Sequence, residues 1–192
     1  PEVVYSNPGL EFAFGPGGHR LVQTLGLSGR LGIATPKEGV VIRSVEMRDG
    51  VDDDPCSLKF PPPWYTGRVV PHDTCLIADK GYKGEAGIWR LGLRDNQPER
   101  ILAETDEAGK TNALAFGRSH VFVVHRRGTL SVFDGEVLRD IPLDSELLLP
   151  NGLTFDPLTN SLLVSQEKPT NAVVRIDLTA DDGPRPISRV VS

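Results

Sequence analysis

Two asparagines stand at the starts of two similar apolar segments. Asn151 lies in the stretch Leu147–Phe155, and Asn112 lies 39 positions earlier in Thr111–Phe116. Each asparagine is followed by a small residue and then by a short apolar run. Asn is a poor strand residue, so its occurrence at two strand entrances needs a reason. One reason is chemical, because the amide oxygen of Asn can bind a hard cation or a polar substrate.

The composition predicts an all-β protein made of a single domain spanning residues 1–192. The 20 glycines and 16 prolines are spread along the chain and divide it into short pieces. Runs such as Val121–Val124 and Ser161–Val164 are short, branched and apolar, which is typical of strands. No stretch with helical periodicity is longer than about two turns.

The charge pattern argues against two classes of partner. The net charge is −5 with both signs interspersed, and only 6% of the residues are aromatic, which disfavours nucleic acid. No apolar run reaches the length that crosses a membrane. The absence of an Asn-x-Ser/Thr site slightly favours a cytoplasmic location, although a removed signal peptide would make the protein secreted. Cys56 and Cys75 either form a disulfide or pack as small apolar thiols.

A repeat of 40 to 46 residues runs along the chain. Four segments share an apolar strand, a polar turn and a second strand, with Ile33, Ile77, Val123 and Leu163 at equivalent places. This period predicts four-stranded propeller blades, of which the chain holds about four. The alternative is a helical or sandwich fold with accidental periodicity. A six-bladed ring needs roughly 250 to 300 residues, so a second chain or a missing segment is expected to close it.

The last predicted blade is the clearest. Its inner strand is expected at 151–155, its second strand at 161–165, its third at 172–178 and its outer strand at 186–191. A lone four-stranded sheet cannot bury both of its faces, so the blades are expected to stack around a central tunnel.

The last 80 residues resemble a known family. The phrases Pro150–Pro157, Leu162–Ser165 and Val173–Leu178 are similar to those of the family of senescence marker protein, gluconolactonase and luciferin-regenerating enzyme. This resemblance covers about residues 110–192. It implies a six-bladed propeller with a divalent cation, usually calcium, in its tunnel, and hydrolysis of a lactone or phosphotriester.

The resemblance also implies a set of ligands. Asn112 and Asn151 match the two asparagines of the family, and Glu11 is the candidate for its glutamate. The aspartate of the family would fall near position 200, beyond Ser192. Calcium, or another divalent cation such as zinc, is therefore expected on Glu11, Asn112 and Asn151, with Asn112 also touching the substrate. Such an ion would polarise a lactone carbonyl and lower the pKa of a bound water.

Two histidines and one glutamine are further candidates. His72 precedes a predicted strand, where it would contact substrate or relay a proton in catalysis, or be a solvated turn residue. His125 and Gln166 end predicted second strands and are expected near the far end of the tunnel.

The proline-rich stretch Phe60–Tyr65 is the remaining candidate. It would either be a stiff loop between blades that covers one mouth of the tunnel, or an extended segment that binds a partner's aromatic groove. In the first case Trp64 and Tyr65 would contact the substrate.

Two functions from different classes follow from these residues. The first is metal-dependent hydrolysis of a lactone or related ester. The second is a propeller that keeps the pocket without hydrolysis, either as a ligand-binding scaffold or as a metal-free biosynthetic enzyme. A third interpretation, an interaction module that uses blade edges, has no particular residue in its support.

Overall fold

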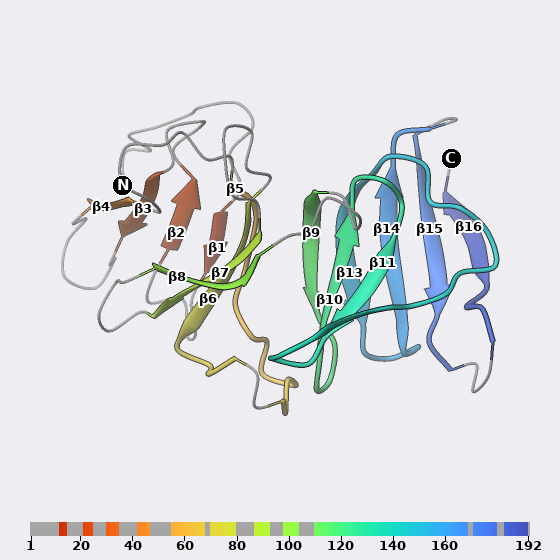
Figure 1. The fold of residues 1–192 in the computed structure, drawn as a ribbon, viewed down its shortest axis with the longest axis horizontal. Coiled ribbons are helices and arrows are strands. Elements are labelled where there is room, and N and C mark those ends of the chain that lie inside the picture. Colours follow the sequence, from red (N-terminus) through yellow and green to blue (C-terminus); the bar gives the residue numbers. More distant parts are fainter. Residues whose placement is uncertain are drawn as a thin grey trace.

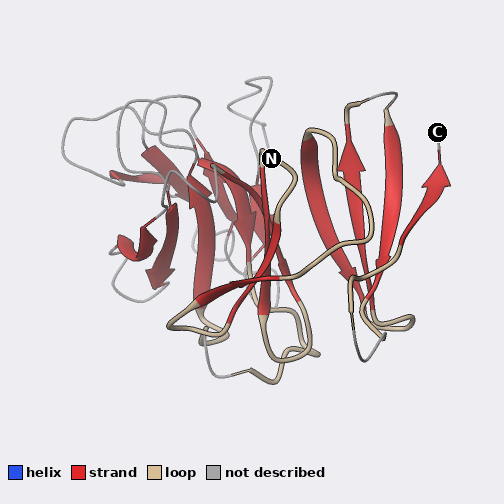
Figure 2. Ribbon diagram, turned by 45° about the vertical axis from the view of Figure 1, so that its right-hand side comes forward, coloured by secondary structure: helices blue, strands red, loops and turns tan. Residues whose placement is uncertain are grey.

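The structure is a computed structural model that describes residues 12–14, 21–24, 30–34, 42–46, 55–67, 70–79, 87–92, 98–103, 110–168, 171–179 and 183–191. These residues form strands and loops, and no helix occurs among them (Figure 2). The predicted all-β class is therefore confirmed.

The described residues form sixteen strands in four sheets, and in each sheet four consecutive strands pair antiparallel in chain order. The first sheet holds β1 (Phe12–Phe14), β2 (Leu21–Thr24), β3 (Arg30–Ala34) and β4 (Ile42–Glu46). The second holds β5 (Pro55–Lys59), β6 (Thr74–Asp79), β7 (Gly87–Gly92) and β8 (Pro98–Ala103). The third holds β9 (Thr111–Phe116), β10 (Val121–His125), β11 (Leu130–Phe133) and β12 (Leu138–Asp140). The fourth holds β13 (Pro150–Asp156), β14 (Ser161–Gln166), β15 (Ala172–Asp177) and β16 (Ile187–Val191).

The sheets follow one another as blades of a propeller. The first strand of each sheet lies against the first strand of the next, so β5 contacts both β1 and β9, and β9 contacts β13. Figure 1 shows the sheets in chain order, with β1–β4 at one end and β13–β16 at the other. The fold is a partial propeller of four four-stranded blades, as predicted. The number of blades in a closed ring stays a prediction.

The strands of the last blade lie where the sequence predicts them, but two of the four equivalent positions of the predicted repeat differ in the structure. Ile33 lies on β3, the third strand of its sheet, whereas Ile77 and Val123 lie on second strands. In the fourth blade Val164, which pairs with Leu153, is the equivalent of Val123, which pairs with Leu114. The predicted equivalents Ile33 and Leu163 are therefore wrong. Neighbouring strands of a blade have similar apolar composition, so composition alone does not show whether a segment is the second or the third strand of its blade.

Two apolar cores hold the described blades together. One lies between the third and fourth blades and includes Phe122, Leu153 and Phe155. The other lies between the second and third blades and includes Leu76, Leu114 and Val123. Alternate residues of β9 point to opposite faces, so Ala113 and Ala115 join the first core while Leu114 and Phe116 join the second.

The far face of the fourth blade is more polar than the matching face of the third. When the two sheets are aligned by their hydrogen-bond registers, Thr154 occupies the position of Ala115, and Ser165 occupies the position of Val124. Ala115 and Val124 are buried against the fourth blade, whereas Thr154 and Ser165 are exposed. This face lacks a partner blade among the described residues.

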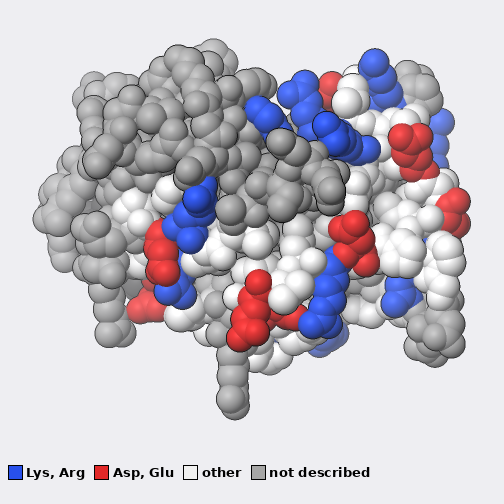
Figure 3. All heavy atoms as spheres, viewed as in Figure 1, with Lys and Arg blue, Asp and Glu red and all other residues white. Residues whose placement is uncertain are grey.

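Charged side chains of both signs are spread over the described surface seen in Figure 3. None of the described residues belongs to a helix that is long and apolar enough to cross a membrane. Cys75 is fully buried in β6. The register places the backbone of Cys56 opposite Ala78 and Asp79 of β6.

Candidate functional site

The structure brings the two predicted asparagines together at the starts of neighbouring inner strands. Asn112 is buried, with 5% of its surface exposed, and Asn151 is exposed. The side-chain Nδ2 of Asn112 donates a hydrogen bond to the backbone oxygen of Pro150 and another, at 3.4 Å, to Oδ1 of Asn151. Asn112 therefore links the third blade to the fourth through its amide hydrogens.

A β-bulge accounts for each asparagine at a strand entrance. In the third blade, Thr111 and Ala113 pair with His125 and Val124, which are consecutive, so Asn112 is the extra residue. In the fourth blade, Asn151 is the extra residue in the same way. A bulge removes a residue from the regular ladder and redirects its side chain, so the poor strand propensity of Asn costs little here. The bulge of the second blade places Cys56 at the equivalent backbone position.

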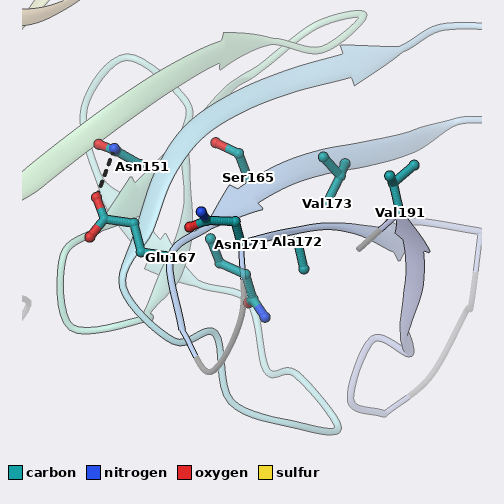
Figure 4. A pocket seen from close by; sticks show the side chains of 8 residues that line it. Asn151, Ser165, Glu167, Asn171, Ala172, Val173 and Val191 are labelled. Atoms are coloured by element: carbon teal, nitrogen blue, oxygen red, sulfur yellow. Dashed lines mark hydrogen bonds between the residues drawn. The ribbon is translucent and has the colours of Figure 1, made fainter.

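Glu167 completes a chain of hydrogen bonds that the sequence did not predict. Nδ2 of Asn151 donates to Oε1 of Glu167 at 3.0 Å (Figure 4). Glu167 directly follows β14, and its backbone nitrogen donates to the oxygen of Leu149 at 3.2 Å. The chain of hydrogen bonds thus leads from the buried amide of Asn112 through the exposed amide of Asn151 to the exposed carboxylate of Glu167.

His125 and Gln166 lie at the same end of the sheets as the asparagines, and not at the far end of the tunnel. Because neighbouring strands are antiparallel, the end of a second strand meets the start of the inner strand: His125 pairs with Thr111, and Gln166 pairs with Pro150. His125 is fully buried, and its Nε2 lies 3.1 Å from Oγ of Ser131, which donates to Asp140. Its ring therefore belongs to a hydrogen-bond network within the third blade.

A cavity of about 340 Å³ opens beside the Asn151–Glu167 pair. Ser165, Val173 and Val191 continue its wall along the far face of the fourth blade (Figure 4). The side chain of Gln166 also lines it and accepts a hydrogen bond from the nitrogen of Leu148 at 3.4 Å. The cavity is polar at the Asn151 end and apolar at the Val191 end, which suits a small molecule with both kinds of group.

His72, Trp64 and Tyr65 lie at the end of the blades opposite to the asparagines, and their contact with a substrate stays a prediction. The loop between β5 and β6 leaves β5 after Lys59 and reaches β6 at Thr74, whereas the bulge marks the other end of β5. Tyr65 is buried against Phe116, the last residue of β9, with ring centres 5.0 Å apart. The loop is the yellow segment below β9 in Figure 1. Glu11 lies outside the described residues.

Three carboxyl groups have pKa values below the ordinary range, and all three lie at that opposite end. Hydrogen bonds from the hydroxyl of Thr159 and the nitrogen of Leu158 lower the pKa of Asp156. The hydroxyl and nitrogen of Thr179 lower the pKa of Asp177, and the nitrogens of Val137 and Glu136 lower that of Asp134. These carboxylates shape turns and do not suit a general base.

The described residues do not by themselves fit a calcium site. No group of three or more His, Cys, Asp or Glu residues among them is arranged to hold a metal ion. Asn112 directs N–H groups, and not its oxygen, at Asn151 and Pro150. Oδ1 of Asn151 and the carboxylate of Glu167 remain as oxygen donors, and calcium takes six to eight.

Comparison with solved structures shows the fold. The chain is similar to virginiamycin B lyase from Staphylococcus aureus, with a TM-score of 0.68 and 12% identity, over 94% of this chain and 54% of that one. It is similar to a streptogramin B lyase, with a TM-score of 0.69 and 11% identity, over 99% and 57% of the two chains. It also matches the β-propeller domain of Cps50 (Swd1) from Myceliophteria thermophila, with a TM-score of 0.67 and 14% identity, over 94% and 57%.

These similarities extend to the fold alone, because identity is low throughout. The chain spans little more than half the length of each of these three structures. No protein-family model and no curated protein sequence matches it.

Proposed function

We propose that the Asn151–Glu167 end of the propeller is a small-molecule site at which the protein hydrolyses a lactone or related ester. The supporting observation is the 3.0 Å hydrogen bond that holds a carboxylate beside an exposed amide at the edge of a cavity. A carboxylate can act as a general base, and a positioned amide N–H can stabilise a developing oxyanion.

The hydrogen bonds give each of the three residues a distinct role in this proposal. Asn112 donates to Oδ1 of Asn151 and thereby turns the Nδ2 group of Asn151 toward Glu167. Asn151 Nδ2 carries a second N–H, which can donate to the carbonyl oxygen of an ester in the cavity. Asn112 is the positioning residue, and Asn151 and Glu167 contact the substrate and the water.

The proposed reaction balances with these groups. Glu167 takes a proton from water while the water oxygen attacks the acyl carbon, and Asn151 stabilises the resulting oxyanion. The tetrahedral intermediate then loses the alkoxide, which receives the proton from Glu167. A general base typically contributes about 10²- to 10⁴-fold in rate, and one oxyanion donor about 10²- to 10³-fold.

The predicted calcium or zinc ion stays a separate proposal. It would need ligands besides Asn151 and Glu167, and the predicted Glu11 is one candidate. When bound, the ion would supply Lewis-acid polarisation of the carbonyl, and the roles given above depend only on side chains of this chain.

A non-hydrolytic propeller is the second candidate. Asn112 directs its amide Nδ2 group at oxygens of the fourth blade, a linking role that needs no metal ion. Two of the structures with this fold are named as lyases. In an elimination, Glu167 would take a proton from a carbon atom of the substrate, a double bond would form, and the leaving group would depart with its bonding electrons.

One experiment separates the two candidates. A panel of lactones and aryl esters would be incubated with the protein in ¹⁸O-labelled water, with and without added calcium or zinc. Hydrolysis places ¹⁸O in the product carboxylate, whereas elimination does not. We expect Glu167→Gln to lose about 10²- to 10⁴-fold of the rate. Glu136→Gln, an exposed residue of the turn between β11 and β12, is the matched control and keeps full activity.

The outcomes decide the proposal. Cleavage without ¹⁸O favours the elimination. Full activity in both Glu167→Gln and Asn151→Ala removes this site from either reaction. Absence of cleavage across the panel under every metal condition rejects the hydrolase and leaves ligand binding as the function to test.

A further inference from the structure

A second cavity, of about 160 Å³, lies at the ends of β9 and β13 that are farthest from the asparagines. Its floor is formed by buried residues of the two inner strands, Ala115, Phe116, Leu153 and Phe155. Its rim includes Phe60 and Trp64 from the loop after β5, together with Lys59 and Thr154. Asn112 and Phe116 are four positions apart on one strand, about 13 Å at the usual rise, so this cavity is separate from the Asn151–Glu167 site.

The aromatic character of the cavity comes from a repeated position. The bulges of the second, third and fourth blades align Phe60, Phe116 and Phe155 at the ends of three successive inner strands. One position earlier, the same alignment places Lys59, Ala115 and Thr154. The middle blade thus has the smallest side chain at this position, and Ala115 lines the cavity together with Phe60, Phe116 and Phe155.

The loop that carries Trp64 is fixed at both sides of that residue. Three prolines precede Trp64, and each has a restricted φ angle. Tyr65 is buried, with 2% of its surface exposed, and its backbone nitrogen donates to the oxygen of Pro62 at 3.0 Å. Both the nitrogen and the hydroxyl of Thr66 donate to the oxygen of Arg118, at 2.7 and 3.1 Å.

Trp64 itself stays 44% exposed beside the cavity. Contact of a large apolar ring with water has an unfavourable hydration free energy, and the buried side chain of this loop is that of Tyr65. Because the loop already restricts Trp64, this side chain loses little conformational entropy when it binds a ligand.

We propose that this cavity is a second ligand site, which takes a planar aromatic group of a small molecule and stacks it on Trp64. The floor residues are apolar, so they favour an uncharged group, and aromatic side chains prefer aromatic partners in stacked or edge-to-face arrangements. This proposal is independent of the chemistry at the Asn151–Glu167 site.

The test is calorimetric titration of the whole chain with 2-naphthol, with its saturated analogue decahydro-2-naphthol as the non-aromatic control. We expect saturable binding at one site for 2-naphthol and at least tenfold weaker binding of the saturated compound. Trp64→Ala weakens 2-naphthol binding at least tenfold, whereas Trp64→Phe retains most of it. Ala115→Leu, which fills the space, abolishes binding.

Two control variants complete the design. Leu158→Ala removes a side chain that is 94% exposed outside the cavity, and Glu167→Gln changes the other site; both are expected to bind 2-naphthol as the unmodified chain does. The proposal is overturned by non-saturating binding, by an equal loss in Leu158→Ala and Trp64→Ala, or by a loss in Glu167→Gln. Because Trp64 is exposed, its substitutions leave the fold intact, and near-ultraviolet circular dichroism verifies this.

Discussion

Replacing Asn112 by Ala and by Asp distinguishes a donor that links two blades from a metal ligand. The side chain is 5% exposed and donates to the oxygens of Pro150 and Asn151. Ala removes both donors and leaves the buried oxygen of Pro150 without this bond. Leaving a buried polar group unsatisfied costs about 1–3 kcal/mol, so we expect Asn112→Ala to lower the free energy of unfolding by that amount.

Asp has nearly the same shape but reverses the hydrogen bonding. One carboxylate oxygen would replace the Nδ2 group and face two oxygens that need donors. The variant would lose the same bonds as Ala and also bury a charge without a partner, which costs about 3–5 kcal/mol when one member of a buried pair is removed. We therefore expect Asn112→Asp to be less stable than Asn112→Ala.

A metal ligand would give the opposite order. Asp is a stronger calcium ligand than Asn, because the charge of the ligands increases affinity. Urea unfolding followed by tryptophan fluorescence, with equal m-values in all variants, would be measured with calcium and with a chelator. The linking role of Asn112 would be refuted if Asn112→Asp were as stable as the unmodified chain, or if calcium stabilised it beyond Asn112→Ala.

Four further predictions follow from the described contacts. Phe155→Ala leaves a cavity beside Phe122 in the core between the third and fourth blades and should lower the free energy of unfolding by about 3–5 kcal/mol. The exposed control Leu158→Ala should change that free energy by no more than about 0.5 kcal/mol. Urea unfolding measures both. The pKa of Asp156 is lowered in the folded protein. Its ionised carboxylate therefore stabilises the fold at pH values above the unfolded pKa of about 3.9, and this stabilisation is lost as the pH falls through the folded pKa. Asp156→Asn should make the Tm less sensitive to pH in that acidic range. If an ion binds at the Asn151 end, Glu167→Gln should weaken terbium luminescence titrations, and Glu136→Gln should not. If a second chain closes the ring, sedimentation velocity should show association that rises with concentration and is reduced by Ser165→Lys on the far face of the fourth blade.

The fold could be predicted from the sequence because blade periodicity depends on many residues at once. Gly and Pro divide the chain, and the apolar runs between them are short, so an error at one strand does not change the class. The last blade was located to within one or two residues because the turn at 157–160 separates two distinct apolar runs. The first blade was misaligned because the apolar runs on β2 and β3 are of similar composition, and only the hydrogen-bond register distinguishes them.

The site was predicted in part. The asparagines were recognised because polar residues interrupt two apolar runs at the same place. Glu167 was missed because its position depends on the antiparallel pairing of β14 with β13, which carries the end of one strand back to the start of the other. The same pairing rule would have placed Gln166 and His125 at the asparagine end. The sequence alone did not show which end of the blades His72, Trp64 and Tyr65 occupy, because that depends on the direction of β5 and β6 in their sheet.

The three bulges also show a repeat that the sequence comparison overlooked. Cys56–Phe60, Asn112–Phe116 and Asn151–Phe155 are equivalent segments of three blades, each with Leu at the third position and Phe at the fifth. The central Leu is buried in every copy, so it serves packing. The first position lies in a bulge, outside the regular ladder, and can change from Cys to Asn without a cost to the sheet. The fourth position changes from Lys to Ala to Thr, and Ala115 of the third blade lines the aromatic cavity. The two candidate sites lie at opposite ends of the inner strands, with the Asn151–Glu167 site at the first position of this repeat and the Trp64 cavity at its fourth and fifth positions.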